Sequence, residues 1–353
     1  MASDERDSER DTTLPAGSFV GSYQLGALLA DGGMGDVYEA THRFLPRKAA
    51  IKVLRDKMQA TSGAREGLLQ EAQILERLAH PAIAHVYDVG VLPDGRPWLA
   101  LEFVEGVPLA ELLHRRGRLE AGEVAAIMLE LIKPLAAAHA LGVVHCDLKP
   151  ENIMFSSDGE RRSVKLIDWG ISRVSGQPAR NGDVAAGTPH YMAPEQVRGE
   201  TVDARTDIYA LGVVAYELLA GAPPFEAATP MEVAMAHLDR PVDALSQRCE
   251  GLPPALVELV HTMLAKSRAA RPTLDHARTT LEEIARVASA VDTAPDKVFI
   301  DALALRPSRI RWTPTGAASD PTDQWRALVH ERATRPLHKR DVPTGVVPPP
   351  DRD

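Results

Sequence analysis

The spacing of apolar residues changes character near Gly106, and this change constrains the fold of the 353-residue chain more than any other feature. Between Tyr23 and Val104 the apolar residues form short runs broken by glycine and proline turns, which is typical of β-strands. Beyond Gly106 they recur every three or four residues, which is typical of amphipathic helices. This separation predicts an α+β fold, with a small β-rich lobe followed by a larger helical lobe.

The pattern also predicts individual elements. In the first lobe it predicts two strands around a glycine turn, a third strand over Ala49–Val53, an amphipathic helix over 64–79, and strands over 83–91 and 97–104. The apolar face of that helix is expected to consist of Leu68, Ala72, Leu75 and Ala79. In the second lobe helices are predicted over 121–141, 206–220, 253–266 and 273–288. Pro134 interrupts the first of these, where an interior proline costs roughly 3 kcal/mol unless the helix kinks.

Both ends of the chain differ in composition from its middle. Residues 1–21 are rich in Ser, Asp, Glu and Arg and have little to bury, so a disordered acidic tail is predicted there. Residues 289–353 hold nine of the 27 prolines, which predicts a Pro-rich, mostly disordered tail with one short helix at 321–333. The folded domain is therefore expected to span residues 22–288.

Composition narrows the classes of protein to which the chain can belong. A net charge of −9 makes DNA or RNA an unexpected partner. The two cysteines, Cys146 and Cys249, suit a reducing compartment and are too few for a tetrahedral zinc site of their own. No apolar stretch reaches the roughly 18 residues that a membrane span requires, and the acidic N-terminus does not resemble a secretory leader. We expect a soluble, cytoplasmic protein with no membrane span and no nucleic-acid partner.

A glycine-rich turn joins the first two predicted strands, in the stretch Leu29-Ala30-Asp31-Gly32-Gly33-Met34-Gly35-Asp36-Val37-Tyr38. Glycines at this density let backbone N–H groups approach an anion without interference from Cβ atoms. A plain hairpin turn would give the same pattern. The stretch is neither a P-loop, which requires a Lys after its last glycine, nor a dinucleotide fingerprint, because a strand follows it.

Lys52 lies between Ile51 and Val53 in the third predicted strand. A lysine in such a place either protects an edge strand or is a buried cation with a function. Glu71 follows 19 residues later on the predicted helix, where an ion pair would hold the ammonium of Lys52 toward phosphate oxygens.

Two further segments concentrate polar side chains. His145-Cys146-Asp147-Leu148-Lys149-Pro150-Glu151-Asn152 is followed by Asp168-Trp169-Gly170, which begins 21 residues after Asp147. The oxygens of Asn152 and Asp168 are of the kind that Mg²⁺ prefers, and this ion usually shares substrate phosphates. A solvated loop with capping Asp and Asn residues is the alternative when each segment is taken alone.

With a third segment, Gly187-Thr188-Pro189-His190-Tyr191-Met192-Ala193-Pro194-Glu195, the chain resembles a eukaryotic-type (Hanks-type) Ser/Thr protein kinase. The Gly-Gly-Met-Gly-x-Val-Tyr form of the glycine turn resembles the bacterial branch of that family. The resemblance extends from Tyr23 to Ala288. It implies the bilobal protein-kinase fold, with an N-lobe over 22–104 that contains helix C and a helical C-lobe over 107–288.

The resemblance also implies roles for individual residues. ATP would be bound by Leu29, Gly32, Gly33, Gly35, Val37, Ala50, Lys52, Glu71, Glu102 and Val104. Asp147 would accept the proton of the substrate hydroxyl, and Lys149 would contact the transferred group. Asn152 and Asp168 would hold Mg²⁺, for which Mn²⁺ is an alternative, and Thr188 would belong to the loop that docks the protein substrate. Asp207 and the pair Glu195–Arg271 would be structural anchors, and Leu101 would be the gatekeeper beside adenine.

The implied activity is ATP-dependent phosphorylation of Ser or Thr hydroxyls in protein substrates. Cys146 stands where most relatives have an arginine that a phosphorylated activation loop holds. Because residues 171–187 contain only Ser172 and Ser175 and no threonine, we predict activity without activation-loop phosphorylation.

Ala30, Cys146 and Trp169 depart from the family pattern and motivate an alternative, a nucleotide-binding pseudokinase that acts as a scaffold or allosteric partner. The presence of every polar residue of the reaction argues against it. A kinase of small molecules is a third, more remote hypothesis. A homodimer through the small lobe is suggested by analogy alone, and the sequence does not identify the protein substrate.

Overall fold

A computed structural model describes residues 13–31, 35–55, 64–158, 161–169, 173–177, 189–289 and 296–304. The chain divides into two compact units, Met1–Ala318 and Ser319–Asp353. All the described residues belong to the first unit. The predicted helix at 321–333 lies outside the described residues.

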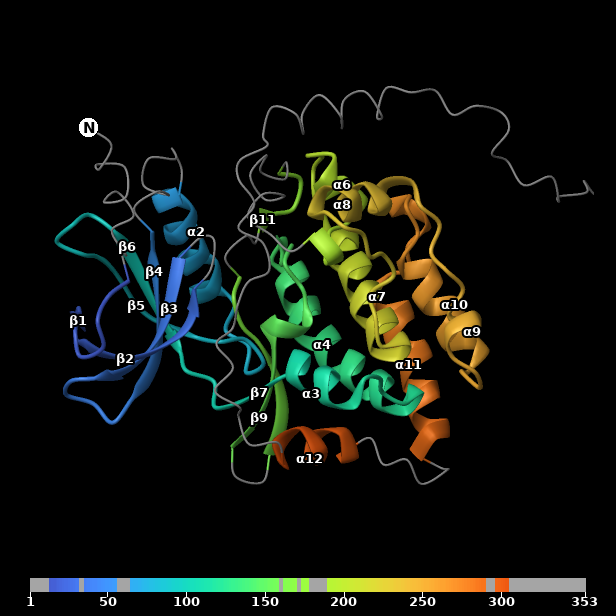
Figure 1. Cartoon of the computed structure of the whole chain (residues 1–353), viewed down its shortest axis with the longest axis horizontal. Helices are drawn as coiled ribbons and strands as arrows, with labels where there is room; N and C mark the ends of the chain where they lie inside the picture. Colours follow the sequence, from blue (N-terminus) through green and yellow to red (C-terminus); the bar gives the residue numbers. More distant parts are fainter. Residues whose placement is uncertain are drawn as a thin grey trace, which may run out of the picture. The chain divides into compact units, whose positions relative to one another are not determined.

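The N-terminal part of the first unit is a six-stranded antiparallel sheet with the order β1-β2-β3-β4-β6-β5 (Figure 1). The strands are β1 (Phe19–Val20), β2 (Tyr23–Asp31), β3 (Gly35–His42), β4 (Lys48–Leu54), β5 (Val86–Val91) and β6 (Pro97–Glu102). The glycine turn therefore joins β2 to β3, as predicted. The last strand ends at Glu102, two residues before the predicted end at Val104.

The register of this sheet places the predicted nucleotide-binding residues on one face. Val37 of β3 pairs with Lys52 of β4, and Ala50 pairs with Leu101 of β6. Paired residues and alternate residues along a strand project to the same side, so all four lie on one face. The opposite face is closed by a separate core that includes Tyr38, Ile51 and Trp98.

Helix α2 (Ala64–Arg77) packs against β5 and β6. Its buried residues include Leu68, Ala72 and Leu75, as the spacing predicts. The predicted extension to Ala79 is wrong: the helix ends at Arg77, Ala79 is exposed, and Leu78 is buried instead. Pro81 limits how far the helix could extend, because the one residue before a proline, here His80, is driven out of the helical conformation.

The C-terminal part is helical (Figure 1), and α4, α7, α10 and α11 pack on one another. The helices are α3 (Leu109–Arg116), α4 (Ala121–Ala140), α6 (Pro194–Val197), α7 (Ala204–Ala220), α8 (Pro230–Asp239), α9 (Leu245–Arg248), α10 (Pro254–Met263), α11 (Leu274–Ser289) and α12 (Asp296–Ala304). Helix α4 runs through Pro134 without ending there. Helix α7 begins two residues earlier than predicted because the Asp203 side chain caps it, accepting a hydrogen bond from the Arg205 amide at 2.8 Å. Among the described residues, no helix combines the length and the apolar character needed to cross a membrane.

Short strands and 3-10 turns between Gly106 and Tyr191 flank the loops that carry the polar motifs of the sequence. They are β7 (Gly106–Pro108), β8 (Val143–Val144), η1 (Pro150–Asn152), β9 (Ile153–Asp158), β10 (Arg161–Leu166), β11 (Arg173–Val174) and η2 (Pro189–Tyr191), and a last 3-10 turn, η3 (Arg268–Ala270), precedes α11. β9 pairs with β10 and β7, and β8 pairs with β11. Together they place the stretch from His145 to Asn152 between the helices and the sheet.

Structure extends beyond both predicted ends of the folded domain. At the N-terminus, β1 pairs with β2, and Val20 is fully buried although it falls in the predicted tail. In the predicted C-terminal tail, α12 packs on β7, β9 and α4, with Phe299 edge-to-face against Phe155 at 5.4 Å. The Pro-rich composition of 289–353 hid this element, because a nine-residue amphipathic helix needs only a few apolar residues, here including Val298 and Ala302.

Candidate active site

Lys52, Glu71 and Asp168 meet where the sheet faces the helical part of the unit. The Lys52 ammonium lies 2.7 Å from Oδ1 of Asp168 and 3.4 Å from both carboxylate oxygens of Glu71. Lys52 and Glu71 are buried, whereas the Asp168 side chain is 33% exposed. The edge-strand interpretation of Lys52 is therefore wrong, since β4 is an inner strand and the lysine is a buried cation.

The charged groups of this cluster shift one another's pKa values. Burial alone would lower the pKa of the Lys52 ammonium, but the carboxylates of Asp168 and Glu71 outweigh it and hold that pKa above its ordinary value. Burial raises the pKa of the Glu71 carboxyl to about 7, against the opposing attraction of Lys52. Lys52 is thus a permanent cation, and the ionisation of Glu71 depends on pH near neutrality.

Asp147, Lys149 and Asn152 form a second cluster on the loop after β8. The Lys149 ammonium donates to Oδ2 of Asp147 at 2.8 Å. The side-chain amide nitrogen of Asn152 donates to the same oxygen at 3.1 Å and to the Asp147 carbonyl oxygen at 2.9 Å. These contacts fix the orientation of the Asp147 carboxylate.

The backbone of this loop is held from within the helical core by Asp207. Its carboxylate accepts hydrogen bonds from the amides of His145 and Cys146, both at 2.9 Å, and lies 2.7 Å from Nε2 of His139. Although burial opposes its ionisation, the hydrogen bond from His139 and those from the amides hold the pKa of Asp207 below its usual range. Asp207 therefore anchors the loop as an ionised, fully buried side chain.

Two residues of the site adopt a left-handed backbone that side chains disfavour. They are Cys146 with φ 66° and Asp168 with φ 57°, the only such non-glycine residues among the described part of the chain. This conformation is maintained by surrounding contacts. Cys146 donates its amide to Asp207 and accepts a hydrogen bond from Nε2 of Gln196 at 2.8 Å, and Trp169 beside Asp168 is fully buried, 4.3 Å from the His145 ring.

The glycine turn is only partly described. Gly35 begins β3, and a Cβ atom there would lie 2.5 Å from the Val53 carbonyl oxygen, so the packing of β3 on β4 requires glycine at this position. Leu29 lies half-buried near the end of β2. Gly32, Gly33 and, in the substrate-docking segment, Thr188 lie outside the described residues.

Glu102 ends β6 and Val104 lies two residues beyond it, and both are half-buried. The Glu102 carboxylate accepts a hydrogen bond from Lys165 of β10, and its amide donates to the His85 carbonyl at 2.7 Å. The Glu102 side chain is thus engaged within the protein, linking the sheet to β10.

The oxygen donors suit a divalent cation that is shared with phosphates. Asp168 offers a partly exposed carboxylate, and the amide oxygen of Asn152 remains for a cation because its nitrogen is used by Asp147. Within the described ranges, no group of three or more His, Cys, Asp or Glu side chains could hold a metal ion by itself. Mg²⁺ fits this donor set, since it binds through one or two protein ligands plus substrate phosphates.

Comparisons with known proteins agree with this geometry. Residues 23–281 match the protein kinase domain. The chain belongs to the protein kinase family. The chain is 34% identical over 294 residues to the serine/threonine-protein kinase pkn3 of Myxococcus xanthus, covering 81% of this chain and 54% of that protein. It is 38% identical over 251 residues to PknB of Mycolicibacterium smegmatis, covering 69% of this chain and 40% of that protein.

The chain thus spans about half the length of the curated relatives it matches, or less. The fold class predicted from the sequence, a bilobal α+β protein kinase, is confirmed. The resemblance to bacterial serine/threonine-protein kinases is confirmed as well.

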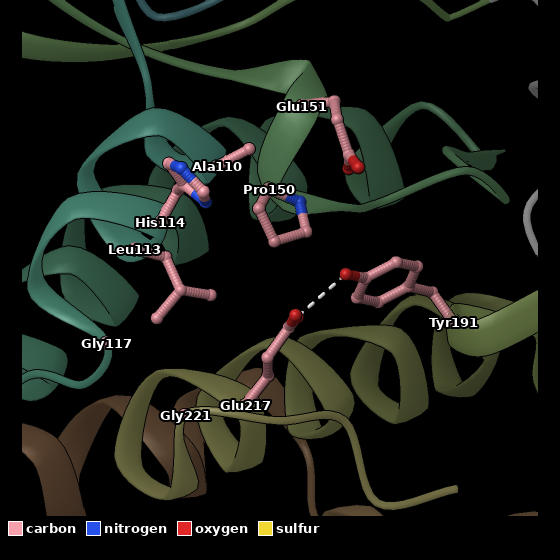
Figure 2. Close-up of a pocket in the computed structure, with 9 residues that line it drawn as sticks. All are labelled: Ala110, Leu113, His114, Gly117, Pro150, Glu151, Tyr191, Glu217 and Gly221. Carbon is pink, nitrogen blue, oxygen red and sulfur yellow. Dashed lines mark hydrogen bonds between the residues drawn. The ribbon is translucent and has the colours of Figure 1, made fainter. Parts of the chain in front are cut away.

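Beside the loop of residues 145–152, the kinase domain has a cavity of about 340 Å³ that the sequence reasoning missed (Figure 2). It is lined by Ala110, Leu113, His114, Gly117, Pro150, Glu151, Tyr191, Glu217 and Gly221. The Tyr191 hydroxyl donates to Oε2 of Glu217 at 2.7 Å. The only signal in the sequence was Glu217, a single acid that ends the apolar run of α7.

Proposed function

We propose that the chain is an ATP-dependent Ser/Thr protein kinase that transfers the γ-phosphoryl group to hydroxyls of protein substrates. One observation carries the proposal: Lys52 of the sheet contacts Asp168 of the helical part, 116 residues away, while Asp147, Lys149 and Asn152 contact one another nearby in the chain. A phosphate-directed cation, oxygen ligands for a metal and a hydroxyl-directed carboxylate are the parts that phosphoryl transfer needs.

In this mechanism the protein positions its reactants and balances their charge. Lys52, oriented by Glu71 and Asp168, binds the phosphates. Lys149 neutralises charge on the transferred group, and Asp147 accepts the proton of the incoming hydroxyl through the carboxylate that Lys149 and Asn152 orient. Asp168 and the Asn152 amide oxygen would hold Mg²⁺, which would offset the charge of the phosphates.

The rest of the nucleotide site is proposed on the same grounds. Adenine would lie against the sheet face that carries Val37 and Ala50, between Leu29 and the backbone at 102–104. Since the Glu102 amide already donates to His85, adenine contacts there would fall to the Glu102 carbonyl and to Val104. Gly32, Gly33 and Gly35 would approach the phosphates, and Thr188 would help to dock the substrate.

We also propose that activity does not require a phosphorylated activation loop. The Cys146 side chain packs with Val144 and Val202, and its backbone is tied to Asp207 and Gln196, so these contacts replace the tie that a phosphate-bound arginine would supply. We expect the double variant Ser172→Ala, Ser175→Ala to keep turnover within about twofold. A loss of tenfold or more would contradict this regulation while leaving the kinase assignment intact.

The location and partners are proposals of the same kind. The chain has only two cysteines, both buried, and so few suit a reducing compartment, which supports a cytoplasmic location. The acidic net charge supports proteins, and not nucleic acids, as substrates. The departures at Ala30, Cys146 and Trp169 leave the polar clusters in contact, so they lend no support to a scaffold without activity.

The deciding experiment is Asp147→Asn. We expect ATP affinity within about twofold of the wild type and turnover on a peptide substrate reduced on the order of 10²–10⁴-fold, because the hydroxyl loses its proton acceptor. Asp243→Asn, at an exposed carboxylate paired with Arg248, is the matched control and should leave both unchanged. Undiminished turnover in the Asp147 variant would reject the assignment.

A further inference from the structure

Helix α12 lies beyond the part of the chain that matches the protein kinase domain, which ends at residue 281, yet it is packed on that domain. It contacts β7, β9 and α4 (Figure 1). Val298 and Ala302 are fully buried, and Phe299 is 7% exposed. Helix α12 thus buries an apolar face as a core helix does, and it belongs to the folded domain.

One aromatic contact dominates the attachment of α12. The Phe299 ring packs edge-to-face on Phe155 of β9, with ring centroids 5.4 Å apart, and Phe155 is fully buried. Such a pair stabilises beyond the apolar area that it buries. An ion pair between Asp301 and Arg116, 3.7 Å apart, adds little because both side chains are partly exposed.

The strand that α12 contacts is the middle strand of the sheet β10-β9-β7. Phe155 pairs with Val107 of β7 on one side and with Val164 of β10 on the other. The backbones of β7 and β9 approach so closely that a Cβ atom on Gly106 would overlap the Phe155 carbonyl oxygen. A displacement of Phe155 would therefore be passed on to both neighbouring strands.

The two proposed metal ligands lie at one end of this sheet. Asn152 comes directly before β9, and Asp168 follows the end of β10 by two residues. Ile153 pairs with Leu166, and the Ile167 amide donates to the Asn152 carbonyl oxygen at 2.9 Å. The pairing of β9 with β10 thus sets the separation of the two ligands, and α12 supports that pairing from β9.

We propose that Phe299 is a positioning residue for the metal site: through Phe155 it holds β9 in place, so that Asn152 and Asp168 bind the same Mg²⁺. The inference rests on the proposed function and adds a helix from outside the matched domain to the parts that Mg²⁺-dependent turnover requires. Residues that orient metal ligands typically change metal affinity or activity by 10- to 100-fold when they are altered.

The first test follows amide hydrogen exchange in the full chain without ATP or metal. Phe299→Ala should make the Ile167 amide exchange about tenfold faster, because its hydrogen bond spans β9 and β10. The matched control is Leu256→Ala, a cavity in helix α10, which packs on α7 and α11. It should leave Ile167 within about twofold. The amides of His145 and Cys146 report the opening of the whole domain and show whether the two variants lose similar stability.

The second test measures turnover on a serine peptide at fixed ATP, below the unfolding temperature of each variant. In Phe299→Ala the free Mg²⁺ concentration for half-maximal turnover should rise about fivefold and kcat should fall about tenfold, while KM for the peptide stays within about twofold. Phe299→Leu refills part of the space and should lie between Phe299→Ala and the wild type in every measurement. Leu256→Ala should keep the Mg²⁺ dependence of the wild type.

Each contrary result has a distinct meaning. Equal acceleration of Ile167 in Phe299→Ala and Leu256→Ala, or an unchanged Mg²⁺ dependence in Phe299→Ala, would reduce α12 to a stabilising element and overturn the inference. If Phe299→Ala does not fold, Phe299→Leu decides, and wild-type values for its Ile167 exchange and Mg²⁺ dependence would overturn the inference as well. A wild-type chain that does not phosphorylate the peptide would contradict the proposed function itself.

Discussion

The cluster of Lys52, Glu71 and Asp168 and the cavity beside the loop of residues 145–152 each contain two largely buried carboxylates, yet their surroundings differ. Glu71 and Asp168 share the Lys52 ammonium, whereas Glu217 accepts a hydrogen bond from the Tyr191 hydroxyl and Glu151 is offset only by a backbone hydrogen bond and the charge of Lys149. Burial raises the pKa of Glu71 and of Glu217 to the same value, about 7. The two sites therefore differ in how the charge of their carboxylates is offset, and not in how strongly burial raises the pKa of those carboxylates.

This difference teaches what each site can bind. A cluster that already holds a cation, and can add a divalent metal, attracts a polyanion such as a nucleotide triphosphate. The cavity, whose carboxylates are offset only by a tyrosine hydroxyl, a backbone hydrogen bond and the charge of Lys149, has no such place for a polyanion. Residue type alone does not distinguish the two sites, since each contains acids on helices or loops.

The largest expected effect on turnover comes from removing the Lys52 cation, which makes the first cluster resemble the cavity more closely. Lys52→Met leaves Glu71 and Asp168 without a cation, and we expect turnover on the peptide to fall on the order of 10²–10³-fold. Lys48→Met, on the same strand but half exposed, is the matched control and should stay within about twofold. If Lys52→Met lowered turnover less than tenfold, the site would not require a cation beside the two carboxylates.

Removal of the Glu71 carboxylate should lower the activity of the protein without lowering its stability. We expect Glu71→Gln to lower turnover about tenfold, because Lys52 loses one of the two groups that orient it. A carboxyl whose folded pKa is raised to about 7 contributes stability below its unfolded pKa and loses it as pH rises through 7, and glutamine keeps that neutral form. The thermal unfolding midpoint at about pH 8 should therefore not fall, and a clear drop would contradict the raised pKa. Glu76→Gln, exposed on the same helix, is the control for both measurements.

The Glu217 carboxyl of the cavity should make the stability of the protein depend on pH. Glu217 also has a raised pKa, so its stabilising contribution is lost as pH rises from its ordinary pKa of 4.5 to its folded pKa of about 7. We expect the free energy of unfolding of the wild type to decline relative to Glu217→Gln by up to about 1.4 kcal/mol per pH unit in that range. Urea unfolding at three pH values measures this slope, and parallel curves for the two proteins would be the opposing result.

The smallest effect concerns the one hydroxyl that compensates Glu217. Tyr191→Phe removes a donor that favours the ionised carboxylate, so the fall in stability described above should move to higher pH. The change in free energy of unfolding should be about 1 kcal/mol or less. The same urea series measures both, and a movement to lower pH would mean that the hydroxyl does not serve Glu217.

Sequence reasoning reached the compensated site because its residues stand in short motifs with fixed separations. Lys52 lies in an apolar strand, Glu71 lies on the helix that follows, and Asp168 lies in a loop motif, so local pattern and family resemblance both selected them. Their meeting is a tertiary contact, and the resemblance implied it where periodicity alone did not.

The cavity could not be predicted from the sequence in the same way. Glu217 is one acid in an apolar helix, and its neighbours in space, Glu151 and Tyr191, are far from it in sequence. Helix α12 was missed for a different reason: averaging over a Pro-rich stretch concealed the few apolar residues, such as Phe299, that pack against Phe155. The composition of a segment averages over many residues, whereas the packing of a short helix depends on a few individual side chains.

The Asp207 carboxylate has a consequence for how the kinase moves. It binds the amide hydrogens of His145 and Cys146 inside the helical core, where water has no access. These two amides should exchange with deuterium only when the whole domain opens, and so be among the slowest in the chain. The loop that holds the reacting carboxylate would then be as rigid as the core, and the motions of the catalytic cycle would have to come from the elements around it.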